Sequence, residues 1–179
     1  MILKAYKSFE HAKRAGVYVS GAAIIAMMLL IVAGIVMRNT AGHSIPASYE
    51  IVEKYLMPLA VLPPLAYIYG AGFMPRMDLL LPRLSSKARG YVISVLTVVE
   101  IVLFSFATVL TWNYAVNGIR GGDSFTAAGS VYIQWPVYFL VPLAFGAIVI
   151  ELCFVLVSNR RRTEKRWTVT DTGGDFIDV

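Results

Sequence analysis

Charged residues are scarce in this chain. They make up 15% of its 179 residues, against about a quarter in soluble domains, whereas 58% are apolar and the mean hydropathy is +0.67. These values exclude an ordinary soluble protein and indicate one integral membrane domain. The net charge of +5 comes from basic residues that flank the hydrophobic runs. We therefore expect a lipid membrane as a partner, and no nucleic acid.

Residues that bind metals and cofactors are equally rare. The two histidines, His11 and His43, lie outside the hydrophobic runs, so no histidine pair can ligate a haem within the bilayer. The single cysteine, Cys153, excludes an internal disulfide and a thiolate cluster, and we expect it to be a small buried apolar residue. The chain has no Gly-rich phosphate loop, no HExxH motif and no believable pair of nucleophile and base. We expect no enzyme, no catalytic residue, no cofactor and no metal.

Four apolar runs are long enough to cross a bilayer. At about 1.5 Å per residue, each reaches roughly the 30 Å of the hydrocarbon core. We predict an all-α integral membrane protein with transmembrane helices at residues 17–37, 55–74, 91–112 and 137–157. The first run is longer than a signal-peptide core and precedes no small-residue cleavage site, so we expect it to be retained.

Proline residues lie inside two of these runs. Each removes a backbone hydrogen-bond donor and favours a kink. We expect kinks at Pro58, Pro63 and Pro64 in the second helix, and at Pro142 in the fourth.

Lys and Arg residues are unevenly distributed among the segments between the runs. Thirteen of the sixteen precede the first helix, lie between the second and third, or follow the fourth. Only Arg38, Lys54 and Arg120 lie in the other two loops. By the positive-inside rule, both termini are expected in the cytoplasm. The expected location is a bacterial or archaeal inner membrane, crossed several times.

Residues 1–16 and 158–179 flank the transmembrane domain at 17–157. In the first segment Ile2, Tyr6 and Phe9 recur at helical spacing, which predicts a basic amphipathic helix in the cytoplasmic interface; a disordered basic start is the alternative. The final segment begins with a basic run and ends in a Gly- and Asp-containing stretch that we expect to be mobile. The expected membrane-interface anchors are Lys4, Lys7, Lys13, Arg14, Arg160, Arg161 and Arg162.

Two carboxylates lie inside the predicted helices. Glu100 falls near the middle of the third, where an ionised carboxylate costs a few kcal/mol unless it is paired or protonated. Candidate partners within the chain are Tyr67, Tyr69, Ser94 and Thr97, and a group on another subunit is the alternative. We favour a protonated Glu100 hydrogen-bonded across a helix interface over a proton- or ion-coupling one, because it has few polar companions. Glu151 is expected to reach toward Arg160 or Arg161.

Short motifs occur in a characteristic order around these helices. The first run ends in Arg38; IPASYEIVE at 45–53 opens the second, MDLLLPRL at 77–84 follows it, and Trp135-Pro136 with Pro142 opens the last. In order, spacing and topology they resemble the small membrane subunit of tripartite ATP-independent periplasmic (TRAP) transporters, over essentially the whole chain. Met74 and Pro75 depart from the family pattern, which often has His and then an aliphatic residue.

The resemblance implies a division of labour. A periplasmic solute-binding protein captures an organic anion, a large elevator-type membrane subunit moves it with sodium, and the small subunit supports the large one. We expect the large subunit to be a separate chain, because this one ends shortly after its fourth helix. Four helices with few polar residues at mid-membrane suit a scaffold better than a transporter acting alone.

Residues near the outer membrane surface are the main candidates for contacts. Arg38 is expected to pair with Glu50 or Glu53, which share a helix face, while ordinary solvated carboxylates are the alternative. The loop at 117–129 either touches the binding protein or is simply exposed. The partner-interface candidates are Arg38, Tyr49, Glu50, Glu53, Asp78, Glu100, Trp135 and Pro136. Two other functions remain open: a small autonomous proton-coupled exporter using Glu100, and an accessory subunit of another membrane complex.

Overall fold

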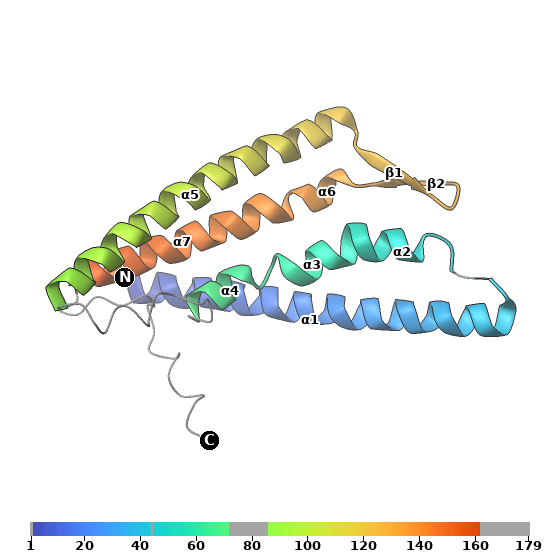
Figure 1. Cartoon of the computed structure of the whole chain (residues 1–179), viewed down its shortest axis with the longest axis horizontal. Coiled ribbons are helices and arrows are strands. Elements are labelled where there is room, and N and C mark those ends of the chain that lie inside the picture. The colour runs from blue at the N-terminus through green and yellow to red at the C-terminus, as the bar shows by residue number, and fades with distance from the viewer. Residues whose placement is uncertain (1, 44, 72–85, 162–179) are drawn as a thin grey trace, which may run out of the picture.

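The computed structural model describes residues 2–43, 45–71 and 86–161 (Figure 1). Four of its helical segments are long and apolar enough to cross a membrane: Tyr6–Ala41, Ser48–Gly70, Ala88–Gly121 and Trp135–Asn159. The expected all-α membrane fold with four spans is confirmed. Asp78, Arg162 and the tail beyond it lie outside the described residues.

The N-terminal segment and the first membrane run form a single helix. α1 (Ile2–Ala41) contains 40 residues and extends for about 60 Å, twice the thickness of the hydrocarbon core. It contains no proline, and Gly16 at the expected boundary does not end the helix. The expected interfacial helix and the first membrane helix are therefore one continuous helix, with no helix end near residue 16.

The second membrane segment is broken where its proline residues predict. It comprises α2 (Ser48–Ile51), a π-helical turn η1 (Val52–Leu56), α3 (Met57–Val61) and α4 (Leu65–Gly70). Pro63 and Pro64 lie in the break between α3 and α4, whereas Pro58 is accommodated in the first turn of α3. The segment begins at Ser48, earlier than the predicted residue 55.

The third and fourth helices are joined by a β-hairpin, which includes part of the segment expected to be a loop at 117–129. α5 (Ser86–Gly121) is followed by β1 (Ser124–Ala127) and β2 (Ser130–Ile133), which pair antiparallel with Ser124 opposite Ile133. Ala128 and Gly129 form the turn with positive φ angles of 49° and 81°, a combination typical of a two-residue hairpin loop. The chain then continues into α6 (Trp135–Tyr138) and α7 (Leu140–Arg161), and Pro142 does not interrupt α7.

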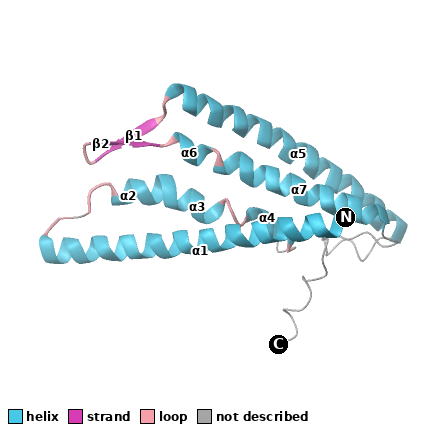
Figure 2. Cartoon of the chain, turned by 180° about the vertical axis from the view of Figure 1, so that it is seen from behind, coloured by secondary structure: helices cyan, strands magenta, loops and turns pink. Residues whose placement is uncertain are grey.

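The helices form two pairs that meet at one end. α1 lies along α3 and α4, and α5 lies along α7; α4 packs on α7 and joins the pairs (Figures 1 and 2). The pairs converge where α1 begins and α7 ends, and diverge toward the hairpin. Tyr69, Ile148 and Leu152 form the core of the junction, with Phe104 and Phe145 packed against it. We refer to the convergent end as the inner end and to the hairpin end as the outer end.

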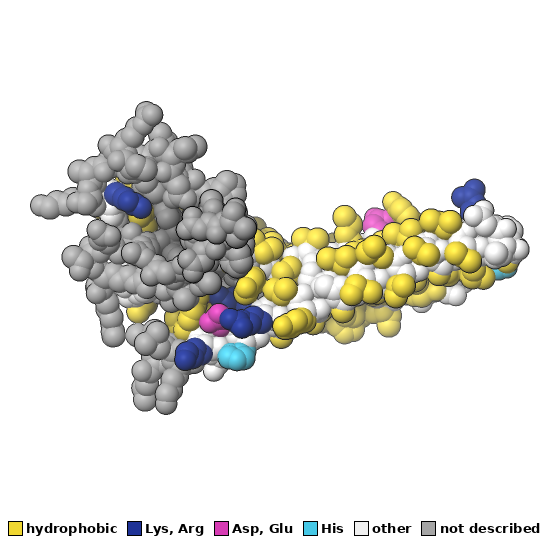
Figure 3. Space-filling view, turned by 90° about the horizontal axis from the view of Figure 1, so that it is seen from below, with side chains coloured by type: hydrophobic (Ala, Val, Ile, Leu, Met, Phe, Trp, Pro, Cys, Tyr) yellow, Lys and Arg dark blue, Asp and Glu magenta, His cyan; other side chains and the backbone are white. Residues whose placement is uncertain are grey.

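Apolar side chains cover the outward faces of the long helices. Along α1 the exposed side chains include Ile25, Met28, Leu29 and Val32. Figure 3 shows this apolar surface in the middle of the molecule, with charged and histidine side chains toward its two ends. The pattern is that of a surface surrounded by hydrocarbon rather than by water.

Candidate functional site

Glu151 takes part in a buried ion pair at the inner end. Its carboxylate Oε2 lies 2.6 Å from the Lys13 Nζ, and the two side chains are 0% and 5% exposed, respectively. The Tyr6 hydroxyl donates a 3.0 Å hydrogen bond to Glu151 Oε1. The Lys13 ammonium also lies 3.4 Å from the Tyr6 oxygen. The pair therefore connects α1 to α7 inside the protein.

This geometry corrects two expectations. In place of a headgroup contact, Lys13 directs its ammonium into the helix bundle. Glu151, which was expected to reach toward Arg160 or Arg161, pairs with Lys13. Lys13 lies outside the predicted spans and on a different helix from Glu151, so local spacing does not identify it as a partner. Because α1 continues straight through residue 16, it carries Lys13 alongside α7.

Aromatic rings enclose the Lys13 side chain. Its Nζ lies 5.0 Å from the centre of the Tyr6 ring and 5.3 Å from that of Phe9. Both rings pack on Phe154 of α7, with centroid distances of 5.4 and 6.0 Å. Cation–π attraction therefore adds to the ion pair where water is excluded.

Gly70, at the end of α4, leaves space for the ion pair. A Cβ at this position would lie 2.7 Å from Glu151 Oε1 and 2.9 Å from the Lys13 Nζ. Both atoms are ends of side chains, so a larger residue at position 70 would have to displace them and would disturb the ion pair. Glycine therefore suits this position, and three helices meet at the pair.

The second intramembrane carboxylate is bound by the residue that precedes Gly70. The buried Tyr69 hydroxyl donates a hydrogen bond to Glu100 Oε2, joining α4 to α5. Tyr69 was one of four predicted partners; Ser94 and Thr97 instead donate to carbonyls of their own helix. Both intramembrane carboxylates thus contact the last turn of α4.

α1 also satisfies the backbone at the break in the second segment. Pro64 has no N–H, so the Ala60 carbonyl lacks its usual helical donor. The buried Ser20 hydroxyl donates to that oxygen. One turn earlier, Gly16 lies so close that a Cβ would be 2.7 Å from the Pro63 carbonyl oxygen. Sequence reasoning missed both residues, although small residues spaced by four opposite a Pro-Pro pair were a usable signal.

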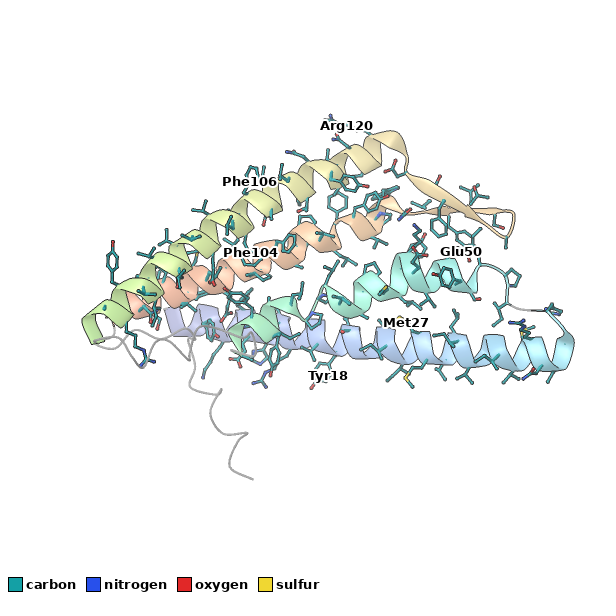
Figure 4. All side chains as sticks on the ribbon, viewed as in Figure 1. Tyr18, Met27, Glu50, Phe104, Phe106 and Arg120 are labelled. Atoms are coloured by element: carbon teal, nitrogen blue, oxygen red, sulfur yellow. The ribbon has the colours of Figure 1, made fainter. Side chains whose placement is uncertain are left out.

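The outer end does not contain the expected ion pair of Arg38 with Glu50 or Glu53. Among the described residues, Arg38 is exposed and makes no such contact, while Glu53 lies 3.8 Å from Lys54. Glu50 lies in the first turn of α2, and the Tyr49 side chain is 74% exposed. Figure 4 shows Glu50 on the hairpin side of the molecule. Because α1 continues to Ala41, Arg38 lies on the helix rather than in the turn that it was expected to close.

The hairpin is fastened to the second membrane segment. The Tyr55 hydroxyl donates to the Ile133 carbonyl, and its ring lies 5.8 Å from that of Phe125. Phe125 stacks on Tyr132 across the two strands. The backbone N–H groups of Gln134 and Trp135 donate to the Asp123 carbonyl at 3.0 and 3.3 Å, which closes the base of the hairpin. Trp135 and the exposed Pro136 therefore begin α6 beside it.

The remaining predicted residues are dispersed. Lys7 is exposed, and Arg14 forms an exposed ion pair with Glu10 at 3.1 Å. The side chains of Lys4, Arg160 and Arg161 lie outside the described residues. Cys153 is exposed on α7, contrary to the expectation of burial, because it lies on the outward face of the helix. Within the described ranges, no cluster of three or more His, Cys, Asp or Glu residues could hold a metal ion.

The comparison with known families is decisive for the class of protein. The family model described as "Tripartite ATP-independent periplasmic transporters, DctQ component" matches residues 27–162. The chain belongs to this DctQ family. The match begins at residue 27, within α1, and covers the rest of that helix and all of the other described helices, together with the hairpin. No curated protein and no solved structure matches the chain.

Membership in the DctQ family makes this chain the small component of a TRAP transporter. This confirms the resemblance noted in the membrane-flanking motifs. The family is one of transporter components rather than of enzymes. Tyr6 and Lys13 precede the matched segment, whereas Glu100 and Glu151 lie within it.

Proposed function

We propose that this DctQ-family chain is the scaffold subunit of a TRAP-type secondary transporter. It supports a large elevator-type subunit, supplied as a separate chain, during sodium-coupled uptake of an organic anion. A periplasmic solute-binding protein delivers the anion. The observation that carries this proposal is the family match, which begins within the first membrane segment and extends through the other three.

The contacts that both intramembrane carboxylates make with other helices of the chain support a scaffold. Glu151 is closed off by Lys13 and Tyr6, and Glu100 is bound by Tyr69. Secondary transporters place several polar groups together near mid-membrane, often at broken helices. Here the broken segment, α3 to α4, contributes its free carbonyl to Ser20 instead of to a substrate site.

We infer further that the inner end faces the cytoplasm, in a multi-pass topology in the inner membrane. The basic residues in the first turns of α1, which are Lys4, Lys7, Lys13 and Arg14, support this orientation through the positive-inside rule. The hairpin and the start of α2 then face the periplasm, where the binding protein docks. Tyr49, Glu50 and Glu53 lie at that end and are our candidates for contact with a partner.

Reconstitution of the components tests this function. We expect sodium-dependent uptake into vesicles when the chain, the large subunit and the binding protein are all present, and none when this chain alone is left out. Co-purification of the large subunit with the tagged chain in mild detergent provides an independent readout. Transport of a solute by this chain alone, abolished by Glu100→Gln, would instead establish a proton-coupled exporter.

A further inference from the structure

The Glu100 carboxylate is only partly satisfied within the chain. Tyr69 binds Oε2, but among the described residues no hydrogen-bond donor contacts Oε1. The side chain is half-buried, and no Lys or Arg occurs in residues 90–119 around it. A carboxylate oxygen exposed to hydrocarbon is costly, whereas a leucine at the same position would cost nothing. When Glu100 is ionised, its remaining oxygen therefore requires a donor.

The surroundings of Glu100 on α5 have the pattern of a helix-packing seam. Leu96, Leu103 and Leu110 recur every seven residues, and Glu100 and Ala107 lie between them at spacings of three and four. This heptad arrangement is typical of helices that pack side by side along their length, and a small residue such as Ala107 permits close approach. Leu103 and Leu110 are 62% and 52% exposed. We call these five residues the leucine edge.

The leucine edge lies at the border of the surface that α5 already uses. Phe104 points inward between α5 and α7, and Phe106 points away from the bundle (Figure 4). Inward packing is provided by Ile93 and Thr97, both buried, while Leu103 is exposed. We therefore expect a further helix on the leucine edge to lie beside Glu100, on the exposed side of α5.

We propose that a membrane helix of the large TRAP subunit packs on the leucine edge and places a hydrogen-bond donor, cationic or neutral, opposite Glu100 Oε1. This inference rests on the proposed function. A second copy of the chain fits poorly, because a parallel symmetric contact along this seam would bring two Glu100 carboxylates together. Lipid fits poorly because it offers no donor at mid-membrane.

Site-specific photo-cross-linking tests which edge of α5 is covered. A benzophenone side chain is introduced at Leu103 and, as a matched control, at Val102, which is also 62% exposed but lies 100° further around the helix. In membranes that contain both subunits, we expect an adduct between this chain and the large subunit from position 103, and little from 102. Adducts with the large subunit from position 102 alone, or from neither position, would overturn the inference, and an adduct of two copies of this chain would do the same.

Variants of Glu100 test the donor itself. Glu100→Leu should reduce the affinity of the large subunit about tenfold or more, because the partner's donor would be left unpaired. Tyr69→Phe removes the hydrogen bond within the chain but leaves Glu100 Oε1 in place. This variant should bind the large subunit more tightly than Glu100→Leu does. In the isolated chain, Glu100→Leu should lower the melting temperature by no more than Tyr69→Phe does. A larger fall would place the missing donor in this chain and contradict the inference.

The two proposals fail differently in these experiments. If the large subunit never co-purifies with the wild-type chain, the proposed function is wrong. If it co-purifies but is insensitive to Glu100→Leu and does not cross-link from position 103, the function stands and the leucine edge is not its contact surface.

Discussion

The Lys13 ammonium contacts the Glu151 carboxylate at 2.6 Å, although the two residues are 138 positions apart in the chain. The contact ties the beginning of α1 to α7, and Gly70 at the end of α4 lies against both side chains. Two charges that would each be costly in a dry environment compensate for one another there. The inner end is therefore held by polar as well as apolar contacts.

Removing one member of the Lys13–Glu151 pair should destabilise the chain severely. Lys13→Met or Glu151→Met leaves an uncompensated buried charge, and we expect a loss of about 3–5 kcal/mol in the free energy of unfolding. The double variant Lys13→Met/Glu151→Met should recover most of this loss, because apolar residues of similar volume replace both charges. Unfolding in detergent, followed by circular dichroism, measures the effect.

The exposed pair Arg14–Glu10 provides the control for that experiment. Arg14→Met removes an ion pair on the same helix, one residue from Lys13, but in an exposed position. Its cost should be below about 1 kcal/mol. Equal losses for Arg14→Met and Lys13→Met would contradict the assignment of Lys13 to a buried pair.

Glycine substitutions along α1 should have opposite effects at two positions. Gly16→Ala places a Cβ 2.7 Å from the Pro63 carbonyl oxygen, a backbone atom that cannot move without separating α1 from the broken segment. We expect it to lower the melting temperature. A Cβ at Gly21 would meet no atom within 4 Å. Gly21→Ala should therefore raise the free energy of unfolding by about 0.5–1 kcal/mol through the higher helix propensity of alanine. A harmless Gly16→Ala would show that α1 does not approach Pro63 this closely.

The Ser20 hydroxyl should stabilise the break at Pro63-Pro64. Ser20→Ala leaves the Ala60 carbonyl buried without a donor, and a loss of about 1–3 kcal/mol is expected in thermal or denaturant unfolding. Thr40→Ala is the control, because the Thr40 hydroxyl donates only to Val36 of its own helix at an exposed position. If the two variants behave alike, the Ser20 contact contributes no stability.

Orientation in the membrane can be measured with single cysteines in a Cys153→Ser background. Val131→Cys in the hairpin is 70% exposed, and we expect a membrane-impermeant maleimide to label it in intact spheroplasts. Lys7→Cys, exposed near the start of α1, should be labelled only after permeabilisation. The reverse pattern would place the inner end outside the cell and contradict the positive-inside assignment.

Several features of the outer end escaped prediction because their sequence signals are weak or conditional. The hairpin at 124–133 has alternating side chains, but its turn is Ala128-Gly129 rather than the usual Asn-Gly or Asp-Gly. The pairing of Arg38 with Glu50 or Glu53 assumed that the first helix ends at residue 37. Because α1 continues to Ala41, Arg38 lies on the helix instead of in a turn.

The sequence by itself determined the class of protein, the number of spans, the break at Pro63-Pro64 and the family resemblance. These depend on hydrophobic length, on the missing N–H of proline and on motif order, all of which are local. Only the tertiary structure decided which partners Lys13, Ser20, Tyr69 and Glu151 have, because those contacts join residues from different helices. Local periodicity placed Lys13 on a polar helix face; the straight continuation of α1 alongside α7 turned the same residue into a buried partner of Glu151.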